Sequence, residues 1–490
     1  MRRTLPIVLV ALLSACSSKK DKVIDPPAEL TDFPATLRVQ RTWDAGLGGK
    51  GEELRLGLGV AMDDGRVFGA GRDGDVAAFD LDSGRMLWRS RTKAPLAGGT
   101  GAGHGLVVVG SSEGAVIALN STDGSERWRV KVNGEVLSAP TIAAQAVIVR
   151  TVDGRLRGLA LDSGKELWMY EQQVPRLSLR GTAVPVVTGN EVICGFDNGK
   201  VVALNIPDGS LLWEATVAPS RGRTELERLV DIDSAVKVYD KYVYVVGFQG
   251  RVAMLALDSG QIWWAQDASS YRGLAVDEDN VYISNADGEV VALKRTAGTE
   301  VWRQKALAHR GLSAPVLTDD AVAVADFKGY VHWLDKATGA LAGRAEAGGE
   351  RVSTPPLANG DRLVLINDEG RITEFRTSPL QLAAAPKRPV KEAAPAAEPA
   401  GPAPVPEAPT TEPAAPLPEP AAPPPSTTEP GAASPPTTTA PAEPGTAPPA
   451  PAEPGAAPPP STTPPTEPNT APPPAGDTPA NPAEPTPRGR

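Results

Sequence analysis

The chain has 490 residues and 51 prolines, and 37 of those prolines lie in its last 110 residues, from 381 to 490. The formal net charge is −10, and this final stretch, with five Lys or Arg against eleven Asp or Glu, carries −6 of it. The nearly balanced remainder has no basic stripe that could follow a phosphate backbone, so nucleic acid is not an expected partner. Two cysteines, Cys16 and Cys194, exclude a disulfide scaffold, and three scattered histidines have no metal-binding spacing, so no metal site is predicted.

The start of the chain is typical of a targeting segment. Arg2 and Arg3 precede an apolar run from Leu5 to Leu13, which fits a signal-peptide core and is too short to span a bilayer. The run ends in Leu-Ser-Ala-Cys at 13–16, which resembles a bacterial lipobox, so residues 1–15 are predicted to be removed and Cys16 to be lipidated. Several acyl chains anchor a protein stably. Ser17 stands where an Asp would resemble the inner-membrane retention signal, so we expect the periplasmic face of the outer membrane. The alternative is an ordinary signal peptide that contains a cysteine.

After an expected linker at 16–36, a short pattern recurs between residues 37 and 378. It consists of an apolar strand, usually an Asp or Asn, a turn glycine, and in most copies a tryptophan four residues after that glycine. A period near 40 with strands on both sides of each turn predicts a β-propeller with four strands per blade. The turn glycines are Gly84, Gly124, Gly164, Gly209, Gly260, Gly298 and Gly339.

The two ends of the repeat region complement each other. A strand around Trp43 has no turn pattern before it, and the last apolar strand, near Phe375, has no tryptophan strand after it. If the first strand completes the last blade, the ring closes without an open edge. The sequence therefore predicts an all-β, eight-bladed propeller closed by pairing of its N-terminal and C-terminal strands.

The repeat tryptophans are expected to be architectural. A large aromatic ring next to a turn glycine is suited to packing between neighbouring blades. They are not interpreted as a catalytic or ligand-stacking set. The set is Trp43, Trp88, Trp128, Trp168, Trp213, Trp264 and Trp302.

The repeat resembles the tryptophan-docking motif of quinoprotein propellers, as Ala78, Asp80, Gly84 and Trp88 illustrate. That motif is shared by PQQ-dependent alcohol dehydrogenases, which are enzymes, and by BamB lipoproteins of the outer-membrane β-barrel assembly machinery, which are scaffolds. A shared fold does not decide between these functions.

Irregular segments between the blades distinguish the two families. PRLSLRG at 175–181 and RTELERLVDID at 223–233 are similar to the signature loops of BamB. LAHRGLSAP at 307–315 and DFKGYVHW at 326–333 are also similar to BamB at the corresponding blades. With the lipobox and the eight blades, the resemblance to the BamB family covers residues 1–376.

The resemblance implies that the two loops dock the periplasmic POTRA domains of BamA. Matched one by one, the residues that would carry docking are Leu177, Leu179, Arg180, Asp231 and Asp233. Exposed leucines suit apolar anchors and an arginine offers a planar charged fork. The resemblance further implies other subunits of the machinery, and unfolded outer-membrane proteins, as partners. Taken alone, the leucines could face a blade interior, the arginine could be a solvated surface residue, and the aspartates could belong to a turn or a calcium loop.

An enzymatic function makes demands that the sequence does not meet. PQQ dehydrogenases have a vicinal cysteine pair beside the cofactor, calcium-ligating side chains and an Asp base, whereas Cys194 stands alone once Cys16 is lipidated. A base and a metal could still come from scattered acidic residues that converge in space. We predict no catalytic residue and no cofactor. A scaffold for an unrelated periplasmic complex remains a further alternative.

The tail is where the chain departs from the family. Residues 379–490 are mostly Ala, Pro, Thr, Glu and Gly, which cannot bury enough apolar surface to offset the entropy of ordering, so disorder is predicted. As a polyproline II spacer at about 3.1 Å per residue it could reach roughly 300 Å. It is interpreted as a solubilising tail, with a tether to the cell wall or to another periplasmic protein as the alternative.

Overall fold

The computed structural model describes residues 25–47, 57–179, 183–220 and 222–380. Cys16, Arg180 and the predicted disordered tail from residue 381 onward lie outside the described residues.

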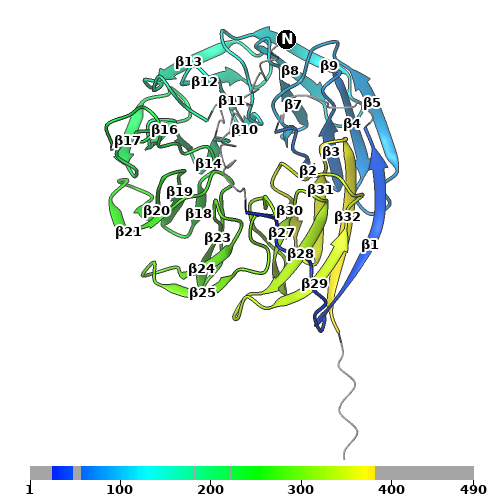
Figure 1. Ribbon diagram of the computed structural model, residues 1–490. Helices are drawn as coiled ribbons and strands as arrows, with labels where there is room; N and C mark the ends of the chain where they lie inside the picture. The colour runs from blue at the N-terminus through cyan, green and yellow to red at the C-terminus, as the bar shows by residue number, and fades with distance from the viewer. Residues whose placement is uncertain (1–24, 48–56, 180–182, 221, 381–490) are drawn as a thin grey trace, which may run out of the picture. The chain divides into compact units, whose positions relative to one another are not determined.

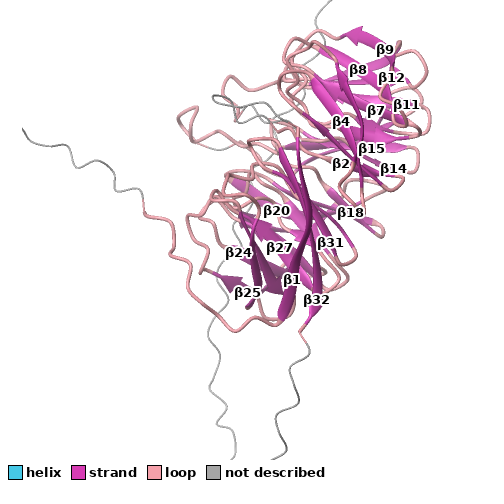
Figure 2. Ribbon diagram, turned by 90° about the vertical axis from the view of Figure 1, so that its right-hand side faces the viewer, coloured by secondary structure: helices cyan, strands magenta, loops and turns pink. Residues whose placement is uncertain are grey.

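The described residues form thirty-two strands (Figures 1 and 2). The first sixteen are β1 (Leu37–Gly46), β2 (Ala61–Asp63), β3 (Arg66–Ala70), β4 (Asp75–Asp80), β5 (Met86–Arg91), β6 (Gly101–Gly103), β7 (Leu106–Gly110), β8 (Ala115–Asn120), β9 (Glu126–Lys131), β10 (Thr141–Ile142), β11 (Ala146–Arg150), β12 (Arg155–Ala160), β13 (Glu166–Glu171), β14 (Val186–Thr188), β15 (Glu191–Gly195) and β16 (Lys200–Asn205). The second sixteen are β17 (Leu211–Thr216), β18 (Lys237–Tyr239), β19 (Tyr242–Val246), β20 (Gly250–Ala256), β21 (Ile262–Ala268), β22 (Leu274–Val276), β23 (Asn280–Ser284), β24 (Val290–Lys294), β25 (Glu300–Gln304), β26 (Val316–Leu317), β27 (Ala321–Ala325), β28 (Tyr330–Asp335), β29 (Leu341–Glu346), β30 (Leu357–Asn359), β31 (Arg362–Ile366) and β32 (Arg371–Pro379).

These strands make eight four-stranded antiparallel sheets arranged as a ring (Figure 1). Blades one to seven each use four consecutive strands, from β2–β5 to β26–β29, and blade eight has the order β30-β31-β32-β1. In blade eight Trp43 pairs with Glu374 and Arg41 pairs with Phe375. The predicted eight-bladed propeller, closed by its first and last strands, is confirmed.

Each blade packs its two faces against its neighbours. The second strand of a blade is therefore a continuous buried run, such as LVVVG at Leu106–Gly110, in which all five residues are buried. Such a run is typical of a strand covered on both faces. The core is accordingly divided among the junctions between blades.

The tryptophans join one blade to the next. At seven junctions the indole Nε1 donates a hydrogen bond of 2.6–3.0 Å to a backbone carbonyl in the turn pattern of the following blade. Trp213 shows why the turn needs glycine: a Cβ on Gly260 would lie 2.4 Å from its ring, and Gly260 has a φ of +68°. The eighth junction differs, because Gly343 stands where a tryptophan would be and Val39 of β1 packs over it.

This geometry predicts a measurable difference between a buried tryptophan and an exposed one. Trp213→Phe removes the hydrogen bond to the Leu257 carbonyl and part of a buried ring, and we expect it to lower the free energy of unfolding by about 1–2 kcal/mol. Trp263 is 60% exposed, so Trp263→Phe is the matched control and should change stability by less than about 0.5 kcal/mol. Chemical denaturation of both variants measures this, and equal losses would contradict the inter-blade role.

The ring has two different faces. The connections from the outer strand of one blade to the inner strand of the next emerge on one side, together with the turns between second and third strands; we call this the loop face. The repeat turns around the glycines emerge on the other side, which we call the turn face. Within the described ranges, no helix has the length and hydropathy needed to cross a membrane.

Candidate docking site

Loop one is the connection from β13 to β14 on the loop face, between blades three and four, and it is described up to residue 179 and again from 183. Leu177 and Leu179 are 41% and 39% exposed. Their side chains are therefore available at the surface and do not face a blade interior. Arg180, the next residue, lies outside the described residues.

Loop two connects β17 to β18, between blades four and five, and its base is firmly held. Ile232 is fully buried and packs so closely on Gly195 that a Cβ there would lie 2.3 Å from it. The Phe248 amide N–H donates to the Asp231 carbonyl at 2.7 Å, which adds an isolated bridge to blade five. The loop is thus anchored on both neighbouring blades.

The tip of loop two is a self-bonded turn. The Glu227 carboxylate accepts hydrogen bonds from the amide N–H groups of Arg223 and Thr224, and the Glu227 amide N–H donates to the Thr224 hydroxyl. This reciprocal arrangement is a capping box. It presents Leu226, which is 63% exposed, the largest exposed fraction among the large apolar side chains of the described residues. Leu226 is not among the docking residues predicted from the sequence, although the Thr-x-x-Glu spacing around it was a usable signal.

Asp231 connects the two loops. Its carboxylate accepts a hydrogen bond of 2.9 Å from the Leu179 amide N–H, although the two residues are 52 positions apart. The Asp231 side chain is fully buried, whereas Asp233 is partly exposed. Asp231 therefore lies beneath the surface and holds the backbone of loop one.

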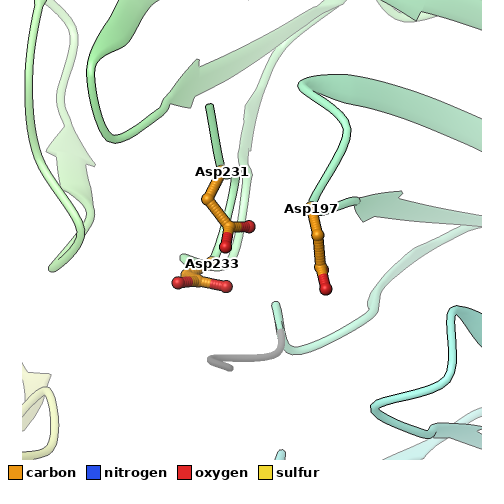
Figure 3. A group of neighbouring side chains, drawn as sticks. All are labelled: Asp197, Asp231 and Asp233. Atoms are coloured by element: carbon orange, nitrogen blue, oxygen red, sulfur yellow. The ribbon is translucent and has the colours of Figure 1, made fainter. Parts of the chain in front are cut away.

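A third carboxylate completes a buried acidic cluster. Asp197 lies in the turn after β15, and one oxygen from each of Asp197, Asp231 and Asp233 lies within 4.8 Å of the others (Figure 3). Arg150 of β11 is buried beside them, forms an ion pair of 2.6 Å with Asp197 and stacks on the Phe196 ring at 4.3 Å. The guanidinium also donates to the Gly195 carbonyl.

This cluster has the donor chemistry of a cation site. Three carboxylates at this spacing could hold a divalent ion, which is the calcium alternative that the sequence left open. Arg150 already occupies Asp197 with a fixed positive charge. Neither Arg150 nor Asp197 belongs to a sequence motif that we singled out, because their partners come from distant parts of the chain.

Burial changes the protonation of the two loop-two aspartates. It raises the pKa of Asp231 to about 6, reinforced by the charge of Asp197, and it raises the pKa of Asp233 to about 9, reinforced by the charge of Asp231. A hydrogen bond between the two carboxyl groups favours the proton on Asp233. At neutral pH the pair therefore shares one proton.

A pH dependence of stability follows from these shifts. Both pKa values are raised above the ordinary value near 4, so the folded state binds more protons than the unfolded chain, and the stabilisation present below about pH 4 is lost as the pH rises through about 6 and then about 9. Asp233→Asn cannot ionise, and we expect its free energy of unfolding to fall less steeply between pH 6 and 9, by up to about 1.4 kcal/mol per pH unit. Urea denaturation across this range measures the slope. Asp267→Asn, at a side chain that is 94% exposed, is the control, and identical slopes in all three proteins would contradict the prediction.

The fold and the two joined loops define a propeller of the quinoprotein type with an apolar, partly acidic loop region on one face. The family model described as outer membrane protein assembly factor BamB matches residues 72–304 and 286–382. The outer membrane protein assembly factor BamB of Pseudomonas aeruginosa is 44% identical over 370 residues, which cover 75% of this chain and 97% of that protein. The chain belongs to the BamB family.

Solved structures agree with this assignment. The crystal structure of BamB from Moraxella catarrhalis is similar with a TM-score of 0.64 and 28% identity, and the match covers 69% of this chain and all of that one. The quinohemoprotein alcohol dehydrogenase of Comamonas testosteroni has a TM-score of 0.55 at 14% identity over 69% of this chain and 76% of that one. The second likeness is one of fold alone.

Proposed function

We propose that this chain is a non-enzymatic scaffold subunit of the outer-membrane β-barrel assembly machinery, held on the periplasmic face of the outer membrane by lipids on Cys16. It docks the POTRA domains of BamA through loops one and two, alongside the other subunits, and orients them so that unfolded barrel proteins are delivered for insertion. Its contribution is geometric, and no chemical step is assigned to it.

The observation that carries this proposal is the hydrogen bond from the Leu179 amide to Asp231. It ties the exposed Leu177 and Leu179 to the rigid base of loop two, so two loops from different blade junctions form one preorganised support. A pair of exposed leucines on a fixed backbone is suited to filling a partner's apolar pockets. Family membership supports the same function, since the related proteins are named as assembly factors.

The five docking residues have different roles in this proposal. Leu177 and Leu179 contact the partner, and Arg180 supplies a charged fork beside them. Asp231 acts from beneath the surface by fixing loop one. Asp233 is partly exposed, and a carboxyl oxygen of it can accept a hydrogen bond from a basic group of the partner or from Arg180.

The test is a pulldown from detergent-solubilised envelopes, comparing the wild-type chain with the Leu177→Ala, Leu179→Ala, Arg180→Ala triple variant after circular dichroism shows that both fold. We expect the wild type to recover a POTRA-containing barrel protein and the variant to lose it. If neither recovers such a protein, the assembly-scaffold function is wrong, and a partner list from the same pulldown would identify a different complex.

A further inference from the structure

The segment before β1, residues 28–36, lies along blade seven, and we call it the strap. At its first residue, the Ala28 amide donates to the Ala308 carbonyl at 2.9 Å, and at its last, the Thr36 amide donates to the Ala342 carbonyl at 2.9 Å. Figure 1 shows this dark-blue start of the chain crossing blade seven beside β28 and β29. Both ends of an irregular segment are therefore fixed by backbone hydrogen bonds.

A buried ion cluster holds the beginning of the strap. Arg310 lies between blades six and seven and donates to the Ala28 carbonyl at 2.9 Å while it forms an ion pair of 2.6 Å with Asp326. Asp326 is fully buried, and its other oxygen accepts the backbone N–H groups of Lys328 and Tyr330. The guanidinium that donates to the strap is thus oriented by a buried carboxylate that two backbone N–H groups hold in place. Hydrogen bonds from a charged donor are about twice as strong as neutral ones.

A second arginine holds the middle of the strap. Arg344 of β29 donates to the Thr31 carbonyl at 3.1 Å, stacks on the Phe33 ring at 4.9 Å, and approaches the buried His332 imidazole at 3.3 Å. Leu30 packs against the core between blades six and seven, which includes Trp302. Two arginines, two apolar side chains and two backbone bonds together bind nine residues of chain.

The course of the strap changes the face from which the N-terminal chain departs. Thr36 lies on the turn face, because its carbonyl accepts from the Leu380 amide and Leu37 pairs with Pro379. Ala28 lies on the loop face, because Ala308 belongs to the connection between blades six and seven. The strap therefore carries the chain over the outer edge of the ring to the face that also holds loops one and two.

We propose that the strap and the two arginines that hold it, Arg310 and Arg344, form a latch. This latch orients the propeller on a membrane surface, with the loop face toward the lipid on the side of blade seven. This inference rests on the lipidation of Cys16 in the proposed function. Twelve residues from 16 to 28 reach at most about 40 Å, whereas release of the strap would lengthen the tether to twenty residues, about 70 Å, and let it leave from the turn face. The latch therefore shortens the tether and makes it leave the propeller from the loop face.

The experiment places a donor dye on either face of blade seven and an acceptor in the membrane. Lys328→Cys on the loop face and Ala337→Cys on the turn face are both exposed sites, labelled in a Cys194→Ser background. The full-length lipidated protein is inserted into vesicles of phosphatidylethanolamine and phosphatidylglycerol that contain acceptor-labelled headgroups. We expect energy transfer from the loop-face dye to be at least twice that from the turn-face dye.

Two variants test the latch itself. Arg310→Met with Arg344→Met removes both arginines that hold the strap. Leu30→Ser with Phe33→Ser loosens the strap while both arginines stay in place, and it serves as the test if the first variant fails to fold. Each variant should reduce the difference in energy transfer between the loop-face dye and the turn-face dye by half or more. Arg303→Met is the control, because this half-buried arginine pairs with Glu289 and Glu300 rather than with the strap.

The outcomes separate this inference from the proposed function. Equal transfer from both faces in vesicle-bound wild type, or an unchanged difference in both strap variants, overturns the latch alone. Failure of the wild-type protein to float with the vesicles, compared with a Cys16→Ser control, overturns the lipid anchor and with it the latch. Docking to POTRA domains is measured separately in solution and is unaffected by either result.

Discussion

Arg150→Met is expected to lower the free energy of unfolding by about 3–5 kcal/mol. The methionine keeps most of the apolar contact with Phe196 but leaves Asp197 buried beside Asp231 and Asp233 without a cation. Removing one partner of a buried ion pair is far more damaging than removing a surface pair, because the remaining charge keeps its desolvation penalty. Guanidinium denaturation at neutral pH measures the loss.

The pH dependence of this loss identifies its origin. Arg150 lowers the pKa of both Asp231 and Asp233 against the effect of burial, so its removal raises those pKa values further. The variant should therefore be closest to the wild type at pH 5, where the carboxyl groups are more protonated, and furthest from it at pH 8. Arg157→Met is the matched control: this arginine is also buried, but its partner Glu166 is 50% exposed and can be solvated, so a loss of about 1 kcal/mol is expected. If both variants lose the same free energy of unfolding at every pH, the effect comes from packing and not from the buried charges.

The fold could be predicted from sequence because its repeats are local. A turn glycine with a tryptophan four residues later marks six blades, and each such glycine packs against the tryptophan of the preceding blade. The unmatched strands near Trp43 and Phe375 indicate how the ring closes. Gly343 shows the limit of this pattern. Its blade lacks the tryptophan, and the beginning of β1 supplies the missing packing, which only the closed ring brings into place.

The site was less accessible to sequence reasoning because its parts meet only after folding. The family resemblance identified residues of both loops, but it did not indicate how deeply each one is buried. Asp231 is fully buried, whereas Leu177 and Leu179 are exposed. Arg150 comes from blade three and Asp197 from blade four, with 47 positions between them. Burial of a charged residue cannot be read from periodicity, since an arginine in a strand is by default an exposed residue.

Leu177→Ala combined with Leu179→Ala is expected to weaken the binding of purified POTRA domains by about 100-fold. Each leucine is exposed in the free chain and held on a fixed backbone, and truncating an interface anchor typically removes about 1–2 kcal/mol, so two together remove about 3 kcal/mol. Leu226→Ala, at the tip of loop two, should weaken binding by up to about tenfold. Calorimetry or surface plasmon resonance with the purified domains gives these dissociation constants.

The control for this prediction is a second pair of exposed leucines on the same protein. Leu211 and Leu212 of β17 are 50% and 48% exposed, at least as much as the loop-one pair, but they lie on the outer strand of blade four. Leu211→Ala with Leu212→Ala removes the same amount of side chain and should leave the dissociation constant within about twofold of the wild type, because apolar exposure alone does not make an anchor. If both pairs weaken binding equally, the partner recognises the outer rim of the propeller as well, and the docking site extends beyond the two loops. If neither pair does, loops one and two are not the docking site, and the support that Asp231 gives to loop one is purely structural.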